Sequence, residues 1–212
     1  MASFSSSTFG SISGRHGTAV AAVNKNGNNV LRLYRKPSNP NSPKQLSQRM
    51  KFSVVTKGLA PLREVIKMGC KDSGAFPKVL GKVIHEAVTG EYPDFTIDFS
   101  KVHIALGTLQ SAEGATAHVT EGTPNNVDFS WNTMIGFHSQ LGTENDRVNI
   151  VCFNENTLLV LPFFNVATRA EGAATVTLPE IWQGNNIHCW IYFSSPDERY
   201  NSNSVYVATI LL

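Results

Sequence analysis

The sequence predicts an α+β protein, mainly β, in which an antiparallel β-sandwich follows a β-hairpin and two or three helices. Apolar residues recur at helical spacing in the middle of the chain, and later they alternate in short runs separated by turn-forming residues. With 212 residues, 42% of them hydrophobic, the chain can bury a core. The expected parts are an N-terminal arm and hairpin at 1–41, a basic helical segment at 42–93 and a sandwich at 94–212.

The first 41 residues predict an arm followed by a hairpin. Residues 1–13 carry no charge and no helical period, and their apolar residues are isolated: Phe4, Phe9 and Ile12. We expect this arm to be mobile in a monomer and ordered only against a partner. Two apolar runs, 17–23 and 30–35, flank an Asn- and Gly-rich separator, which predicts a hairpin with a long loop. Because an isolated hairpin is marginally stable, it should dock on its own body or on a neighbour.

Helix signals begin at Ser42 and Pro43, which fit the N-cap and the first helical position. Pro61 can start a second short helix, and residues 76–88 again show helical spacing. Two or three helices are therefore expected between residues 43 and 89. The face that the first helix should bury carries Leu46, Met50, Val54 and Val55.

The apolar period changes to two after residue 94. Residues 95–99 and 102–106 alternate, which favours extended structure. The strands expected after them are 115–119, 127–131, 148–153, 158–163, 174–178, 187–193 and 205–211. Seven or so short strands with turn-rich separators over about 110 residues are typical of an antiparallel β-sandwich.

The C-terminal part has the order of features of a known module. Trp131 ends the alternating run 127–131, the run 175–179 precedes a turn at Gly184, and 187–193 follows as a long central strand. In this order the segment resembles a fibronectin type III or related immunoglobulin-like domain. The resemblance implies an immunoglobulin-like sandwich with Trp131 in its core.

Short motifs also extend over nearly the whole chain. They are 14–17, Arg32 with 35–37, Asn39 and Pro40, Gln45, Gln48, Arg49, Phe52, 88–90, 92–95, His188 with Cys189, and 203–206. Together they are similar to an uncharacterised family of single-chain proteins, common as multiple paralogues in Bacteroidetes. The front segment also resembles the beginnings of some phage-associated structural proteins. The family resemblance implies a fold and no known catalysis, reaction or ligand.

The formal net charge of +2 conceals a strong polarity. Residues 1–90 carry 14 Lys and Arg against three acids, a net +11, whereas residues 91–212 carry four against 13, a net −9. No Asp or Glu precedes Glu64. Such asymmetry is typical of proteins that bind nucleic acid, an anionic surface or, head to tail, another copy of themselves. A solvated basic region without a partner is the plainer alternative.

Motifs for chemistry are absent from the sequence. No two of the six His stand at i+2 or i+4, and there is no CxxC, HExxH, phosphate-binding GxxxxGK[ST] or GxSxG. We therefore expect no enzyme activity, no catalytic residue, no metal, no cofactor and no small-molecule substrate. Cys152 and Cys189 fall in two expected strands, where adjacency would allow either a disulfide or two buried thiols.

A structural role is the expected function. The protein would self-associate into a particle, ring or filament, in a phage- or surface-associated setting, through its arm and its oppositely charged faces. The residues expected to bind the partner are Phe4, Phe9, Ile12, Arg32, Arg35, Lys36 and Arg49. The alternative is a nucleic-acid-binding protein without sequence specificity that uses the basic N-terminal half.

The sequence carries few signals for cellular location. No run of 18 apolar residues indicates a membrane span, and no signal-peptide pattern is present at the start. The sequence is compatible with a cytoplasmic protein, a particle-associated protein or one exported by a leaderless route.

Overall fold

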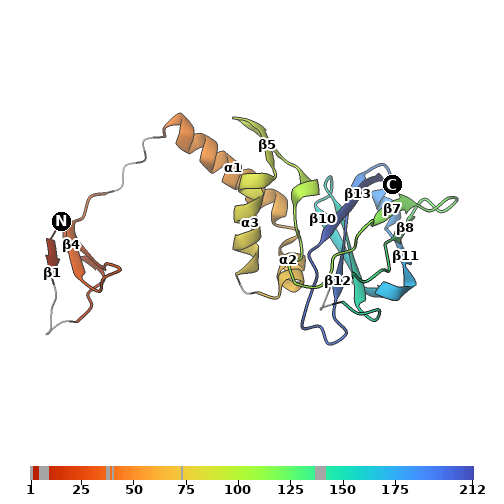
Figure 1. Cartoon of the computed structure of the whole chain (residues 1–212). Coiled ribbons are helices and arrows are strands. Elements are labelled where there is room, and N and C mark those ends of the chain that lie inside the picture. Colours follow the sequence, from red (N-terminus) through yellow and green to blue (C-terminus); the bar gives the residue numbers. More distant parts are fainter. Residues whose placement is uncertain (1, 5–9, 37–38, 40, 73, 137–141) are drawn as a thin grey trace. The chain divides into compact units, whose positions relative to one another are not determined.

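The computed structural model describes residues 2–4, 10–36, 39, 41–72, 74–136 and 142–212. The chain forms two units, Met1–Ser42 and Pro43–Leu212. It is mainly β with three helices, which is the predicted α+β class (Figure 1). The helices and the sheets that we expected at 42–93 and 94–212 both lie in the second unit. None of the helices in the described ranges is long and apolar enough to cross a membrane.

The first unit is a four-stranded antiparallel sheet with the order β1-β4-β3-β2. Its strands are β1 (Ala2–Phe4), β2 (Gly14–His16), β3 (Ala19–Val23) and β4 (Asn29–Leu33). Strands β3 and β4 form the predicted hairpin, and the backbone N–H groups of Asn26 and Asn28 donate to Asn24 Oδ1 within its loop. The prediction that the arm is ordered only against a partner is wrong for residues 2–4, because β1 pairs with β4 of its own chain. Strand β4 would otherwise leave an edge of unpaired backbone groups.

Helices α1 (Pro43–Leu59), α2 (Arg63–Cys70) and α3 (Ala75–Glu86) confirm the helix prediction. The prediction that the first half of α1 buries Leu46 and Met50 is wrong, because these side chains are 36% and 38% exposed. Val55 and Leu59, near the end of α1, are fully buried with residues of α2 and α3. Figure 1 shows the first turns of α1 extending beyond α3.

The second unit contains two larger sheets with the orders β10-β9-β12-β13 and β11-β8-β7, in addition to the β5–β6 hairpin. Its strands are β5 (Val88–Glu91), β6 (Asp94–Ile97), β7 (Thr116–Val119), β8 (Asn126–Ser130), β9 (Arg147–Asn154), β10 (Leu159–Thr168), β11 (Ala173–Thr177), β12 (Asn186–Ser194) and β13 (Val205–Leu211). Short 3₁₀ helices are η1 (Phe99–Lys101), η2 (Arg169–Glu171) and η3 (Glu180–Trp182). Strands β7 to β13 confirm the seven runs predicted after residue 115.

The alternating stretch 102–106 is not a strand. It runs through the core between the helices and the four-stranded sheet, where Ile104 and Ala105 are fully buried. The N–H groups of both residues donate to Ser204 Oγ, at 2.9 and 3.3 Å, and Trp190 Nε1 donates to the carbonyl of Val102 at 2.9 Å. Side chains therefore satisfy the backbone groups that a strand would pair with its neighbour.

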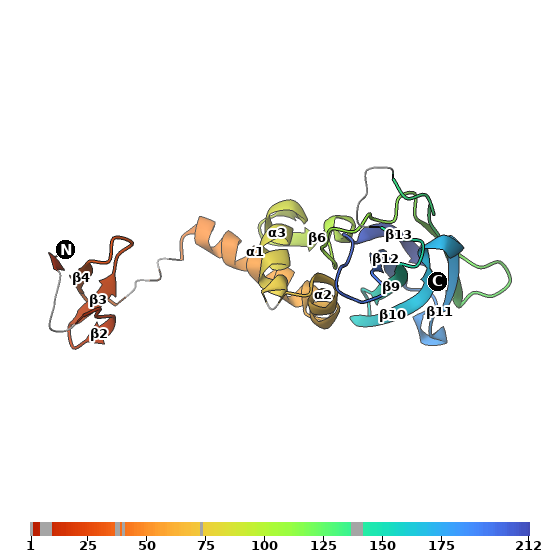
Figure 2. The ribbon, with the colours of Figure 1, turned by 60° about the horizontal axis from the view of Figure 1, so that its bottom comes forward.

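The two central strands of the four-stranded sheet, β9 and β12, are buried on both faces. One face of β9 and β12 packs against β8 and β11, and the other face packs against the helices. Figures 1 and 2 show the helices on one side of this sheet and β7, β8 and β11 on the other. The helical segment and the sheets therefore share a core. Trp131 lies between the two sheets, as predicted, with 5% of its surface exposed and its ring edge-on to Phe193 at 6.3 Å.

Candidate functional site

The basic residues predicted to bind a partner lie on exposed surface of the first unit or on α1. Arg32 is on β4, Arg35 and Lys36 follow it, and Arg49 is on α1 in the second unit. The strand register places Arg32 and Arg15 on one face, since both are opposite Val20 of β3. The structure thus adds Arg15 to the predicted set.

An aromatic residue accompanies these cations. The guanidinium of Arg15 lies 4.0 Å from the centre of the Tyr34 ring, and Tyr34 directly follows β4. Cation–π contacts of this kind hold an arginine in place while leaving its outer N–H groups accessible. One face of the small sheet therefore presents ordered cations and an aromatic ring.

The apolar residues predicted to bind a partner have different positions. Ile12 is half-buried, and its N–H donates to Asn29 Oδ1 at 3.0 Å, so it belongs to its own sheet. Phe4 is in β1, but its side chain lies outside the described part of the structure, and Phe9 lies wholly outside it. The neighbouring apolar residues Val23 and Leu33 are 39% and 67% exposed.

Burial is sparse throughout the first unit. Among its described side chains only Ala21 and Asn29 are buried. A unit of about 40 residues can rarely bury enough apolar surface to be stable without a partner, a metal or disulfides. The described part of the first unit therefore buries little apolar surface for its size.

The three-stranded sheet and its flanking turns are strongly acidic. No Lys or Arg occurs in residues 102–146 or 170–198. The acids on these strands or next to them are Glu113, Glu121, Asp128, Glu171 and Glu180. The hydroxyl groups of Thr175 and Thr120 both donate to Asp128, and Thr175 has the larger effect. These hydrogen bonds hold the pKa of Asp128 below its ordinary value, so its charge persists at neutral pH.

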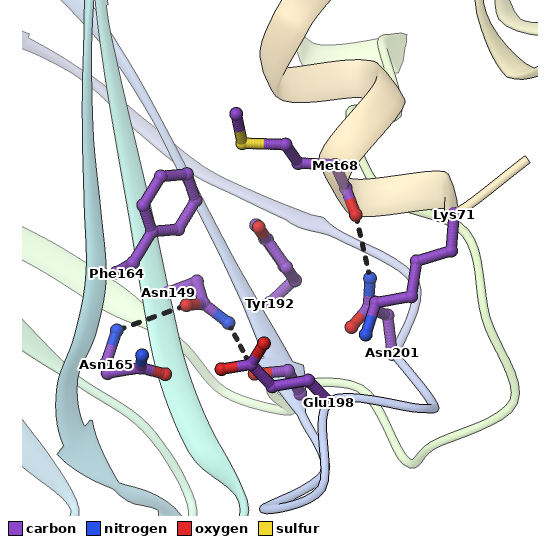
Figure 3. A pocket seen from close by; sticks show the side chains of 9 residues that line it. Met68, Lys71, Asn149, Phe164, Asn165, Tyr192, Glu198 and Asn201 are labelled. Carbon is purple, nitrogen blue, oxygen red and sulfur yellow. Dashed lines mark hydrogen bonds between the residues drawn. The ribbon is translucent and has the colours of Figure 1, made fainter. Parts of the chain in front are cut away.

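A pocket of about 410 Å³ opens on the helix side of the four-stranded sheet, beside the end of α2 (Figure 3). Its walls come from the end of α2, from β9, β10 and β12, and from the loop before β13. The lining residues are Met68, Lys71, Asn149, Phe164, Asn165, Tyr192, Ser194, Glu198 and Asn201. The volume falls within the range of about 300–1,000 Å³ typical of small-molecule sites.

Polar side chains on three strands form the floor of this pocket. Asn149 Nδ2 donates to Ser194 Oγ at 3.0 Å, and the backbone N–H of Asn165 donates to Asn149 Oδ1 at 3.2 Å. The Tyr192 hydroxyl has no hydrogen-bond partner among the described residues. Burial raises the pKa of Tyr192 to about 12, so at neutral pH its hydroxyl keeps a proton to donate.

Asn201 joins the pocket wall to α2. Its Nδ2 donates to the carbonyls of Met68 and Gly69, at 3.3 and 2.7 Å, which belong to the last turn of α2. Its Oδ1 is buried and has no partner in the described part of the chain. A buried acceptor left unpaired costs about 1–3 kcal/mol. A Cβ on Gly107 would lie 1.8 Å from the Asn201 carbonyl oxygen, so only glycine fits beside this residue.

Unusual backbone geometry is concentrated at the pocket. Five described residues other than glycine have a positive φ: Asn41, Lys71, Leu158, Asn165 and Glu198. Three of the five line this one pocket. Asn165 also lies where β10 bulges, between Phe163 and Ala167, and the bulge presents Phe164 and Asn165 to the pocket. Backbone strain of this kind tends to occur at functional sites.

A second polar cluster lies on the same face of the sheet, around His188. The imidazole contacts the Tyr206 hydroxyl at 2.9 Å and Glu155 Oε2 at 3.3 Å, and its ring centre lies 4.6 Å from that of Phe99. The Tyr206 hydroxyl also contacts Thr209, and burial raises the pKa of Tyr206. These contacts supply hydrogen-bond partners to a mostly buried imidazole.

The two strand cysteines are neighbours. Cys152 and Cys189 are directly opposite on β9 and β12, with 3.9 Å between their Sγ atoms, and both are free thiols. Their mutual hydrogen bond and their burial raise the pKa of Cys152 well above its ordinary value. No group of three or more His, Cys, Asp or Glu in the described ranges could hold a metal ion.

Sequence reasoning missed the pocket because its residues come from separate elements and form no local motif. The nearest signal is Asn165, since asparagine tolerates a positive φ better than most residues. Nothing in the sequence indicates that Asn149, Tyr192 and Asn201 come together.

Comparison with protein families finds one matching description, a family of unknown function (DUF6266), over residues 11–208. The chain belongs to this family. The match extends from the first unit to β13. A search of curated proteins finds no match.

Proposed function

We propose that this DUF6266 protein is a non-catalytic structural protein that self-associates into a particle, ring or filament. The basic first unit of one copy would bind the acidic three-stranded sheet of the next. The observation that carries the proposal is the first unit itself, a β-sheet in which only two of the described side chains are buried and which has no acidic residue. Such a sheet needs a partner to cover its apolar residues.

Charge and backbone geometry both favour a second copy as that partner. The first unit carries five Lys or Arg and no acid, and the three-stranded sheet with its turns carries five acids and no Lys or Arg. Strands β7 and β11 are the edges of that sheet, so an added strand could pair with either one. Because each copy carries both surfaces, the contact is heterologous and can propagate.

Charge reversal tests this contact. One variant combines Arg32→Glu, Arg35→Glu and Lys36→Glu, and a second combines Glu113→Lys, Glu121→Lys and Glu180→Lys. The control reverses three exposed lysines on the helices: Lys57, Lys67 and Lys82. Sedimentation velocity and negative-stain microscopy would report the assembly state of each protein and of the two reversed proteins mixed in equal amounts.

Each reversed protein should remain monomeric by itself, and the mixture should assemble, because opposite charges then meet again. The control should assemble like the unchanged protein. Assembly should weaken with added salt, since the screening length falls from about 10 Å at 0.1 M to about 3 Å at 1 M. Unchanged assembly of the reversed variants, or a wild-type chain that stays monomeric at high micromolar concentration, would refute the proposal.

We also infer that the two facing sheets form an immunoglobulin-like sandwich. If β7 to β13 are named A, B, C, C′, E, F and G in chain order, the sheets become A-B-E and C′-C-F-G. This order follows the immunoglobulin-like pattern, in which B and E share one sheet and C, F and G the other. The buried Trp131 supports the same assignment. We also infer, from the sequence motifs, that DUF6266 is the family from Bacteroidetes that the chain resembles.

Nucleic-acid binding is the second candidate function. It is favoured by the face of the first unit that combines Arg15, Arg32 and Tyr34, because cations beside an aromatic ring suit a single strand without sequence readout. Fluorescence anisotropy with a labelled mixed-sequence oligonucleotide would test it. Binding that weakens steeply between about 50 and 200 mM salt and is lost in the Arg32, Arg35 and Lys36 variant would favour this function.

A further inference from the structure

We propose that the pocket between α2 and the four-stranded sheet is a saccharide-binding site. All nine of its lining residues belong to the second unit. The proposal is therefore independent of the self-association argued above.

The polar groups of the pocket match a ligand with several hydroxyls. A sugar hydroxyl both donates and accepts, so it binds best where both kinds of group are within reach. Ser194 Oγ accepts from Asn149, which leaves its own proton to donate, and the Tyr192 hydroxyl can donate or accept. The side-chain amide of Asn165 has no partner among the described residues and offers two donors and an acceptor beside them.

The orphan oxygen of Asn201 adds an unpaired acceptor to this set. Both of its amide protons are directed to the end of α2, which holds the side chain in place. Because Oδ1 is shielded from solvent, a ligand hydroxyl reaches it only when the pocket wall shifts, and a hydrogen bond there would remove the penalty of an unpaired buried group.

Apolar side chains provide the other surface that a sugar requires. Phe164 and Met68 are 41% and 55% exposed, and Figure 3 shows them on different walls of the pocket, one from β10 and one from α2. The C–H face of a pyranose ring packs on exposed aromatic and thioether surface in the same way as other apolar groups. Exposed apolar groups beside hydrogen-bonding groups are the usual composition of a ligand pocket.

The charges at the pocket favour a neutral ligand. Lys71 and Glu198 contribute one charge of each sign, and Glu198 also pairs with Arg147 at 3.3 Å. An anionic ligand such as a phosphate would require several cations or a bidentate arginine, and the lining contains neither. The site is also largely preformed, because the bulge and the Asn149 hydrogen bonds fix its floor before a ligand arrives.

Binding of defined saccharides to the full-length protein tests the proposal. A glycan array would identify candidate ligands, and calorimetry with the corresponding free mono- or disaccharide would measure affinity. Tyr192→Phe removes only the hydroxyl. Asn165→Gly removes the side-chain amide, and glycine readily keeps a positive φ and the backbone N–H. The matched control is Ile181→Ala, which truncates a residue that is 79% exposed and does not line the pocket.

We expect a saccharide to bind and each pocket variant to raise its Kd about tenfold, which corresponds to about 1.4 kcal/mol. The Ile181→Ala control should bind like the unchanged protein. Circular dichroism and melting temperature would establish that each variant is folded, and Phe164→Ala replaces any variant that is not. The proposal is overturned if no saccharide binds, if binding is the same in the pocket variants and the control, or if free amino acids bind more tightly than any sugar.

Discussion

The buried pair of Arg169 and Asp146 allows a quantitative test of the packing at one end of the two facing sheets. Each side chain is 1% exposed, and Arg169 Nη2 and Nε lie 3.1 and 3.2 Å from Asp146 Oδ2. Nη2 also donates to the carbonyl of Gln110 at 2.8 Å, and the guanidinium lies 3.8 Å from the centre of the Phe193 ring. Burial lowers the pKa of Arg169, and the hydrogen bond and charge of Asp146 oppose that shift, so Asp146 stabilises the buried guanidinium.

Asp146→Ala should cost about 3–5 kcal/mol, because it leaves a buried cation without its counter-ion. Arg169→Met should cost less, about 1–3 kcal/mol, because Asp146 still accepts from the N–H and hydroxyl of Thr143. In the double variant no buried charge remains unpaired. Its loss should therefore fall short of the sum of the single losses by about 2 kcal/mol.

Urea unfolding followed by tryptophan fluorescence measures these differences. All three tryptophans lie in the second unit, each no more than 5% exposed, so the signal reports on the unit that contains the pair. Glu86→Ala is the control, because its partner Lys82 is 3.9 Å away on the surface, where an ion pair is worth about 0–1 kcal/mol. A loss below about 1 kcal/mol in Asp146→Ala, or strictly additive losses in the double variant, would refute the reasoning.

Two further predictions concern aromatic residues of the same unit. Trp131→Ala should cost about 3–5 kcal/mol in urea unfolding, and a loss below about 1 kcal/mol would show that the ring is not in the core. Burial raises the pKa of the Tyr192 phenol from about 10 in the unfolded chain to about 12 in the folded protein. The free energy of unfolding should therefore fall as pH rises from about 10 to about 12, because only the unfolded phenol ionises in that window, and Tyr192 should have no effect on it below about pH 10. Tyr192→Phe should remove that loss in alkaline unfolding monitored by circular dichroism, whereas a Tyr192 phenol that ionises near its ordinary value in the folded protein would contradict the prediction.

Periodicity predicted most secondary-structure elements correctly because helices and strands have different local repeats. It failed where tertiary contacts override the local pattern. The alternating stretch 102–106 has the period of a strand, but Ser204, some hundred residues later, takes the backbone hydrogen bonds that would have formed one. Leu46 and Met50 have the spacing of a buried helix face, but both are exposed, and the core residues of α1 are Val55 and Leu59 near its end.

Charge and composition are visible in a sequence, and they identified the cations of the first unit as candidates for partner contact. Pairing of β1 with β4 depends on a long-range register that no local pattern encodes, so the arm could not be assigned to its own sheet in advance. The pocket could not be anticipated for the same reason, since its residues meet only after the sheet has formed and β10 has bulged.

The sequence by itself determined the helical region and most of the extended segments, where the cations and acids gather, and that Trp131 is a core residue. These properties depend on a few neighbouring residues or on composition alone. Only the tertiary structure decided that β9 and β12 are buried on both faces, between the helices and the three-stranded sheet, and that the chain forms two units. Those decisions belong to contacts between residues far apart in the chain, whose partners are selected by the packing of whole elements.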